Sequence, residues 1–202
     1  MRLIGLAGGS GSGKGTVSGV FKSAGVPCFD CDAIYHRMIS RDSTLCREIV
    51  NCFGSSVRKE NGGIDRRALA AMVYDDPEKK RLLDLITHRR ILKVCGDWIR
   101  YRRRKGYSAA VIDAPLLFES GLDRKCDITL AVIAPLELRL SRIVERDGIT
   151  PEEAKKRIAM QIPDDELIRR ADRVIRNDGD VATLETKVLK LMESINEGST
   201  SK

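Results

Sequence analysis

Five short apolar runs alternate along the chain with longer stretches of helical periodicity. Each run is nearly continuous in apolar character, and the five are 3–7, 26–30, 109–114, 128–133 and 172–177. Such runs are typical of strands in a parallel sheet that helices cover on both faces. Strands separated by helices need crossover connections, so the pattern predicts an α/β fold.

The segment 33–105 is expected to be largely helical and to contribute no strand to the sheet. Asp76 is a capping carboxylate that precedes Pro77, a residue favoured in the first helical turn. Apolar residues follow at near-helical spacing; they are Leu82, Ile86, Ile91, Cys95, Trp98 and Ile99. We therefore predict one domain with a helical insertion at 33–105 and a core formed by 1–32, 106–140 and 164–195.

A glycine-rich stretch, GLAGGSGSGKGTV, follows the first predicted strand and precedes a helical pattern. Phosphate-binding loops read G-x-x-x-x-G-K-[ST], and Gly8, Gly13 and Lys14 fit this spacing. Glycines let backbone N–H groups point inward, and the helix N-terminus adds partial positive charge. The strand–loop–helix context favours a nucleoside triphosphate site over a plain glycine turn. The absence of G-x-G-x-x-G disfavours hydride chemistry.

The loop departs from the common motif at one position. Gly15 stands where a serine or threonine usually follows the lysine, and Thr16 comes one residue later. The order GKGT resembles the loop of adenylate kinase, and that resemblance implies a magnesium ion held largely through water. Thr16 is then better placed for a phosphate oxygen.

Two carboxylates lie at the ends of predicted strands. Asp32 follows Asp30 at the end of the second strand, and Asp113 ends the third. Because the carboxyl ends of parallel strands face the ligand crevice, Asp32 is a candidate general base and Asp113 a candidate magnesium ligand. The alternative is that these residues only cap helices or turns.

An arginine stripe follows the fourth predicted strand. Arg139, Arg142 and Arg146 are three and four residues apart and share one helix face. The other face is expected to be buried and carries Leu136, Leu140, Ile143 and Val144.

The next helix is predicted to begin at a capping box, Thr150-Pro151-Glu152-Glu153, and to run until just before Pro163. It carries Arg157. Two arginine-bearing helices joined by a short turn predict a lid, 141–163, that would close on a transferring phosphoryl group and exclude water. The alternative is a pair of exposed helices of mixed charge.

The composition of the chain excludes few classes of function. Among 202 residues, 36 Lys and Arg against 29 Asp and Glu give a net charge of +7, which suits nucleic acid, anionic lipid or polyphosphate substrates. Only Cys28 and Cys31 have C-x-x-C spacing, so a zinc site is poorly supported, and a redox pair is the alternative to reduced cysteines. With no secretory signal and no membrane-length segment, we expect a cytoplasmic protein.

Taken together, these motifs resemble dephospho-coenzyme A kinases over nearly the whole chain. The residues that carry the resemblance are GLAGGSGSGKGTV, VPCFDCDAIYHR, ITHRRI, DAPLLFESGL, RLSRIVERDGIT, EEAKKRIAMQIP and ADRVIRNDG. The resemblance implies a P-loop kinase fold with a five-stranded parallel sheet, a coenzyme A-binding insertion and a lid. It implies ATP- and Mg²⁺-dependent phosphorylation of the ribose 3′-hydroxyl of dephospho-coenzyme A. The expected partner is that small molecule, with neither nucleic acid nor membrane, in a monomer or weak homo-oligomer.

The resemblance also implies roles for individual residues. Asp32 would be the general base, with Lys14, Arg142 and Arg146 as the other catalytic residues. ATP would contact Gly11, Ser12, Gly13, Lys14, Gly15, Thr16 and Asn177. The acceptor would contact Asp32, His88, Asp113 and Arg157. Thr16 and Asp113 would hold magnesium, directly or through water. Arg89 departs from the family, which usually has proline after the histidine.

Two alternatives stay open. A nucleoside or nucleotide kinase shares the loop, the lid and the sheet, and it would respond to nucleosides instead of dephospho-coenzyme A. A P-loop switch or basic nucleic-acid binder would hydrolyse nucleotide slowly and bind DNA or RNA with a steep salt dependence. The arginine-bearing lid disfavours the switch.

Overall fold

The sheet predicted from the apolar runs is present. The computed structural model describes residues 1–41, 43–74 and 76–197. The strands are β1 (Arg2–Ala7), β2 (Cys28–Asp30), β3 (Ala109–Asp113), β4 (Ile128–Ile133) and β5 (Arg173–Arg176). Their order is β2-β3-β1-β4-β5, and β1 pairs in parallel with β3 and β4, as β4 does with β5. All five predicted strands and the parallel sheet are confirmed.

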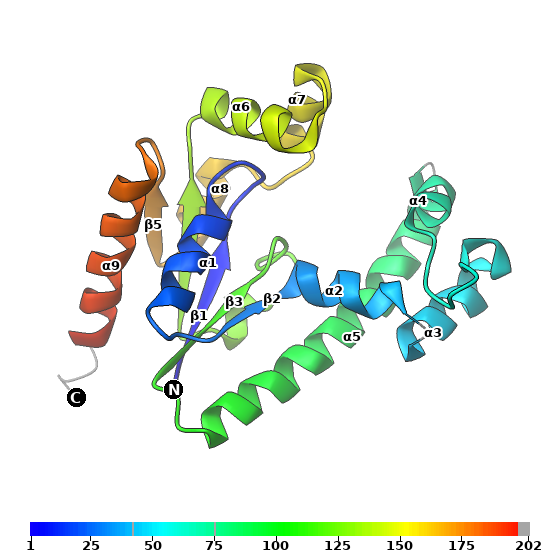
Figure 1. Ribbon diagram of the computed structural model, residues 1–202, viewed down its shortest axis with the longest axis horizontal. Coiled ribbons are helices and arrows are strands. Elements are labelled where there is room, and N and C mark those ends of the chain that lie inside the picture. Colours follow the sequence, from blue (N-terminus) through cyan, green and yellow to red (C-terminus); the bar gives the residue numbers. More distant parts are fainter. Residues whose placement is uncertain (42, 75, 198–202) are drawn as a thin grey trace. The chain divides into compact units, whose positions relative to one another are not determined.

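Helices connect the strands (Figure 1). They are α1 (Lys14–Ser23), α2 (Cys31–Ser40), α3 (Thr44–Phe53), α4 (Arg66–Tyr74), α5 (Pro77–Arg104), α6 (Leu136–Asp147), α7 (Pro151–Ala159), α8 (Asp164–Arg170) and α9 (Val181–Glu197). The chain divides into two compact units, one formed by Met1–Phe29 with Arg102–Lys202 and the other by Asp30–Tyr101. We call them the sheet unit and the helical unit.

In the sheet unit, α1 and α9 pack together against one face of the sheet. Their shared core is apolar and includes Leu6, Phe21, Leu130 and Val188. On the other face, a Cβ added to Gly5 would lie 2.8 Å from Cys126 Sγ and 2.9 Å from a Leu117 methyl carbon. The segment after β3 therefore packs directly on β1, where only glycine fits.

The insertion predicted at 33–105 consists of helices and, among its described residues, contributes no strand to the sheet. Asp76 Oδ1 accepts a hydrogen bond from the Lys79 backbone N–H at 3.0 Å, so the predicted cap of α5 is confirmed. Of the predicted apolar face, Ile86, Cys95 and Ile99 are buried, whereas Leu82 is 37% exposed. Leu82 is exposed because it lies only about one turn from the start of α5. Within the described part of the chain, every helix is too short or too polar to span a membrane.

Helices α6 and α7 form a small layer of their own with a core of Leu140, Ile143 and Ala154. The predicted capping box is present, because Thr150 Oγ1 accepts from Glu153 N at 3.2 Å and Glu153 Oε2 accepts from Thr150 N at 2.8 Å. The helix ends at Ala159, earlier than predicted.

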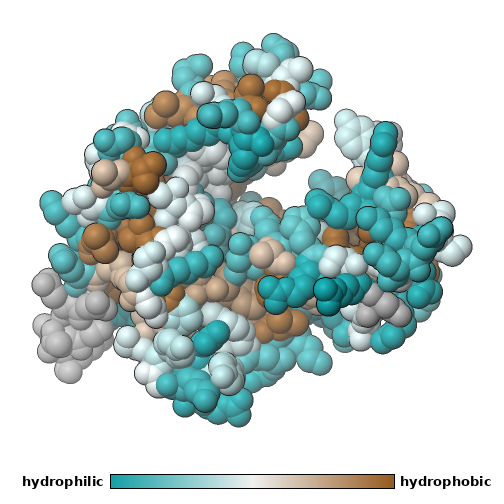
Figure 2. All heavy atoms as spheres, viewed as in Figure 1, coloured by the Kyte–Doolittle hydropathy of each residue, from teal (hydrophilic) through white to brown (hydrophobic). Residues whose placement is uncertain are grey.

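The expectation that Leu136 is buried was wrong. Leu136 is 51% exposed because it is the first residue of α6 and lies a full turn before Leu140, which packs on α7. Figure 2 shows hydrophobic atoms reaching the surface over this layer.

Candidate active site

The glycine-rich loop joins β1 to α1, and close backbone packing fixes its shape. Gly11 and Gly13 have φ of 75° and 95°. A Cβ on Gly11 would lie 2.6 Å from the Arg139 carbonyl oxygen, and one on Gly13 would lie 2.1 Å from Asn177 Nδ2. Both positions therefore need glycine for conformation and for space.

The N-terminus of α1 is open to a ligand. Among the described residues no side chain caps the helix, whose N-cap is Gly13. Unsatisfied N–H groups at a helix start, together with the helix dipole, favour an anion such as a phosphate. The Ser12 side chain is buried, and its hydroxyl has no partner in the described part of the chain. Any contact of Ser12 with phosphate would thus come from its backbone.

Lys14 lies at the start of α1 and forms an ion pair with Asp113 at the end of β3. The pairing of β1 with β3 explains this contact, because Leu6 and Asp113 are register partners. The side chains of Lys14 and Asp113 are only 17% and 8% exposed, so both charges are largely withdrawn from water. Removal of one partner would take this ion pair away from a charge that is largely buried, which is costly. The structure thus joins two residues that were proposed separately from the sequence.

Asn177 follows β5 and is 4% exposed. Its Nδ2 donates a hydrogen bond of 2.8 Å to the Ser12 carbonyl oxygen. The side-chain amide therefore supports the phosphate loop from the side of β5, a role that the sequence did not suggest. Its expected position near adenine remains a prediction.

The arginines of α6 and α7 fall into two groups. Arg142 donates from Nη1 to the Gly11 carbonyl oxygen at 3.1 Å, so it touches the phosphate loop directly. Arg146 instead binds Asp147 through two hydrogen bonds of 2.7 and 2.8 Å, and Arg157 binds the same carboxylate. The Arg146 guanidinium, with help from Arg157, lowers the pKa of Asp147 from 3.8 to about 2.

Arg139 is buried, with 4% of its surface exposed, and it bonds to Ser10, Gln161 and Asp164. The helical period places Arg139 correctly on the side of Arg142. The phosphate loop covers that side near the start of α6, which the period alone cannot show.

Asp32 and His88 lie in the helical unit. Asp30 caps α2, since its Oδ1 accepts from Ala33 N at 2.9 Å. Asp32 lies in the first turn of α2 with an exposed side chain, so it is not the capping residue. His88 lies in α5 and is half-buried. Their roles in catalysis remain predictions.

The described residues offer few protein ligands for a metal ion. No group of three or more His, Cys, Asp or Glu side chains in the described residues forms a metal site. A Cβ at Gly15 would meet no atom within 4 Å, so space beside Lys14 is free of protein. A hydroxyl on Thr16 and the Asp113 carboxylate suit an ion that keeps most of its own water, as Mg²⁺ does.

All six cysteines are thiols in the structure, with no disulfide among them. Burial raises the pKa of the Cys28 thiol, which opposes the thiolate character that a reactive redox cysteine needs.

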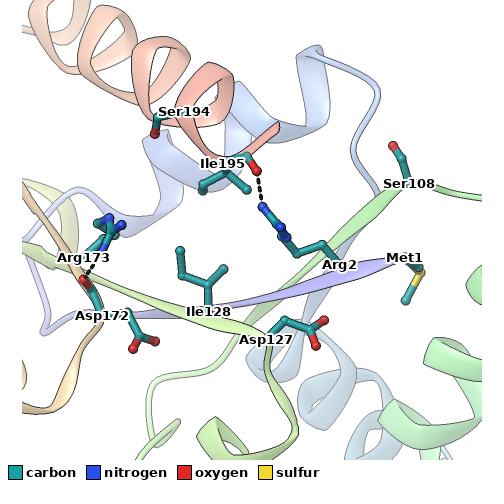
Figure 3. Close-up of a pocket in the computed structure, with 9 residues that line it drawn as sticks. All are labelled: Met1, Arg2, Ser108, Asp127, Ile128, Asp172, Arg173, Ser194 and Ile195. Atoms are coloured by element: carbon teal, nitrogen blue, oxygen red, sulfur yellow. Dashed lines mark hydrogen bonds between the residues drawn. The ribbon is translucent and has the colours of Figure 1, made fainter. Parts of the chain in front are cut away.

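A hollow of about 720 Å³ lies at the amino-terminal edge of the sheet, opposite the phosphate loop (Figure 3). The acidic side chains that line the hollow accept hydrogen bonds from residues of the strands. Asp127 accepts from Leu3 N at 2.6 Å, and Asp172 accepts from the backbone N–H and hydroxyl of Thr129 at 2.8 and 2.7 Å. Arg2 points to the carbonyl oxygen of Ile195. These contacts secure strand ends and the end of α9, and they explain the hollow's polar lining.

Comparisons with known proteins identify the family of this chain. A family model described as dephospho-CoA kinase matches residues 2–183. A dephospho-CoA kinase of Symbiobacterium thermophilum is 41% identical over 179 residues, covering 89% of this chain and 75% of the relative. One of Corynebacterium glutamicum is 37% identical over 195 residues, covering 96% and 98%.

A crystal structure from Thermus thermophilus is also similar, with a TM-score of 0.81 and 33% identity over 96% of this chain and 97% of that one. The sheet order, the phosphate loop and the flanking helices are those of a P-loop kinase. The chain therefore belongs to the dephospho-CoA kinase family, which catalyses the last step of coenzyme A synthesis.

Proposed function

We propose that this kinase transfers the γ-phosphoryl group of ATP to the ribose 3′-hydroxyl of dephospho-coenzyme A, releasing ADP and coenzyme A. One observation supports the proposed binding of ATP, the phosphoryl donor. An uncapped helix N-terminus, the Lys14–Asp113 pair and Arg142 meet at one glycine loop. Backbone amides, an ammonium and a guanidinium together suit a triphosphate.

On the donor side, Lys14 would leave Asp113 at least in part to bind the β- and γ-phosphates. Its pairing with Asp113 keeps the ammonium next to the loop before nucleotide arrives. Arg142 already reaches the loop, and its guanidinium would stabilise charge on the phosphoryl oxygens during transfer. Arg146 would have to exchange Asp147 for the nucleotide to act in the same way.

On the acceptor side, we propose that Asp32 accepts the proton of the 3′-hydroxyl as the new O–P bond forms and the bond to the β,γ-bridging oxygen breaks. Its exposed position in the first turn of α2 leaves the carboxylate accessible to a substrate. Asp30 already serves as the helix cap. We propose that the insertion 33–105 binds dephospho-coenzyme A, with His88 on α5, and that Arg157 contributes from α7.

Thr16 and Asp113 would hold Mg²⁺, largely through water because Gly15 offers no hydroxyl. When bound, the ion neutralises phosphate charge. A cytoplasmic location and a monomeric or weakly associated state remain predictions.

The test is ADP formation in a coupled assay with different acceptors. We expect ADP only with dephospho-coenzyme A, and mass spectrometry should find one added phosphoryl group on the ribose. Coenzyme A is the matched control, because its 3′-hydroxyl is already phosphorylated. Stimulation by nucleosides alone would show a nucleoside kinase. Slow hydrolysis that ignores all acceptors, with salt-sensitive binding of DNA or RNA, would show a switch.

A further inference from the structure

Ser10, in the first half of the phosphate loop, has all three of its polar groups bound by two side chains from distant segments. Its carbonyl oxygen accepts from Arg139 Nε at 2.9 Å. Its backbone N–H donates to Gln161 Oε1 at 2.9 Å, and its hydroxyl accepts from Gln161 Nε2 at 2.8 Å. Arg139 lies in α6, and Gln161 follows the end of α7. We call this arrangement the Ser10 clamp.

Arg139 is the buried centre of the clamp. Besides Ser10, its guanidinium donates to Asp164 Oδ1 at 2.9 Å and to Gln161 Oε1 at 3.1 Å. Asp164 compensates the charge, and the three acceptors lie around one planar fork that only arginine offers. A fully buried charge with this many directed bonds holds its neighbours in one geometry.

Two glycines of the loop lie too close to Arg139 and Gln161 to carry a side chain. A Cβ on Gly9 would lie 2.2 Å from Arg139 Nη2 and 2.8 Å from Gln161 Oε1. A Cβ on Gly11 would lie 2.6 Å from the Arg139 carbonyl oxygen. At these two positions glycine is needed because a side chain would collide with Arg139 or Gln161. The glycine motif alone suggests a different reason, namely room for phosphate.

We propose that Arg139 and Gln161 are positioning residues, which fix the first half of the phosphate loop in its nucleotide-binding shape and tie it to both ends of the lid. The proposal rests on the proposed function in that it takes ATP as the donor. Neither residue needs to touch the nucleotide. Their effect is transmitted through Ser10 to the amides and glycines that follow it.

The test compares Gln161→Leu with Gln161→Glu. Leucine fills similar space but removes all three hydrogen bonds, whereas glutamate keeps an oxygen for Ser10 N and Arg139 and can accept from the Ser10 hydroxyl. Met160→Leu is the matched control, because Met160 is the neighbouring residue and is 80% exposed. Two quantities are measured: the affinity for a nonhydrolysable ATP analogue by calorimetry, and hydrogen exchange of the backbone amides from Gly8 to Gly13.

We expect Gln161→Leu to weaken the analogue about tenfold, less than the sum of three lost hydrogen bonds because the loss reaches the nucleotide only through Ser10, and to speed exchange at Ser10. Gln161→Glu should restore both, and Met160→Leu should change neither. A merely structural role would lower the melting temperature of Gln161→Leu without changing affinity or loop exchange, and that result would overturn the proposal.

Ser10→Ala keeps the experiment decisive if Gln161→Leu does not fold. It removes only the hydroxyl bond, so it should weaken the analogue about threefold; unchanged affinity would count against the clamp. If the wild type bound no nucleotide, the proposed function would fail, and the exchange measurement would still decide whether Gln161 fixes the loop.

Discussion

The two units of the chain bury different kinds of residue. Of the seven buried polar or charged residues described, six lie in the sheet unit; they are Ser12, Ser18, Asp113, Thr129, Arg139 and Asn177. Thr87 is the one in the helical unit, where its hydroxyl donates to the Leu83 carbonyl oxygen of its own helix at 2.8 Å.

This difference shows that the buried polar groups with fixed positions lie mainly around the phosphate loop of the sheet unit. A buried charge or amide is costly unless its partners are in place, and four of the six contact or belong to the phosphate loop. The helical unit is held by an ordinary apolar core of residues such as Ile39, Ile49 and Val57, and it keeps its charged groups near water. Such a unit can adapt its surface to a substrate without breaking buried polar contacts.

Lys14→Ala is expected to have the largest effect. It removes the ammonium for the phosphates and the ion pair of Lys14 with the buried Asp113, so the barrier should rise by at least about 3–4 kcal/mol. Steady-state kinetics measures this, with Lys22→Ala on the exposed side of α1 as control. Activity near that of the control would refute the donor site.

Asp32→Asn tests the catalytic share of the helical unit. Loss of a general base should lower turnover by about a hundredfold or more, while affinity for the ATP analogue stays nearly unchanged. Asp30→Ser is the matched control, because serine keeps the cap of α2. If Asp32→Asn retains most of its activity, the general-base assignment is wrong.

Ile49→Ala tests whether packing alone holds the helical unit. Ile49 is 0% exposed, so the substitution should reduce the free energy of unfolding by about 2–5 kcal/mol. Denaturant titration measures this, and Leu85→Ala, at a side chain that is 66% exposed, should cost much less. Nucleotide affinity should not change under conditions where the protein stays folded. A tenfold loss of that affinity would break the contrast between the units.

Gly15→Ser asks whether the missing hydroxyl weakens metal binding. The position has open space, so serine should fit and offer Mg²⁺ a direct ligand. We expect affinity for Mg²⁺ with the ATP analogue to improve about fivefold, the effect of one added polar contact. Gly19→Ser, in the same helix and with the same open space, should have no effect. Equal behaviour of the two variants would mean that the ion lies elsewhere.

The smallest effect concerns the turn between α6 and α7. The pKa of Asp147 falls from 3.8 to about 2, chiefly through the Arg146 guanidinium. Because the folded value is the lower one, the pairing contributes fully above the unfolded value and is lost as pH falls through about 2. Carbon NMR titration of the Asp147 carboxyl group measures this, and a midpoint near 4 would show that the pair does not persist in solution.

Local patterns in the sequence determined much of the molecule. Apolar runs predicted all five strands, and the central strands β1, β3 and β4 are indeed buried along almost their whole length. The caps at Asp76 and Thr150 were readable because a cap involves residues only three apart. The phosphate loop followed from its glycines between a strand and a helix, and Lys14 and Asp113 were each identified as strand-end or loop residues.

Tertiary structure alone decided which of these residues meet. Gln161 bonds to Ser10 across 151 positions and Asn177 to Ser12 across 165, and no local period carries such a pairing. The helical period placed Arg139 on one face with Arg142, but it could not show that Arg139 is buried because the loop after β1 lies over the start of α6. The physical reason is that hydrophobic periodicity specifies a helix face, whereas the partner of that face depends on the order of the strands in the sheet.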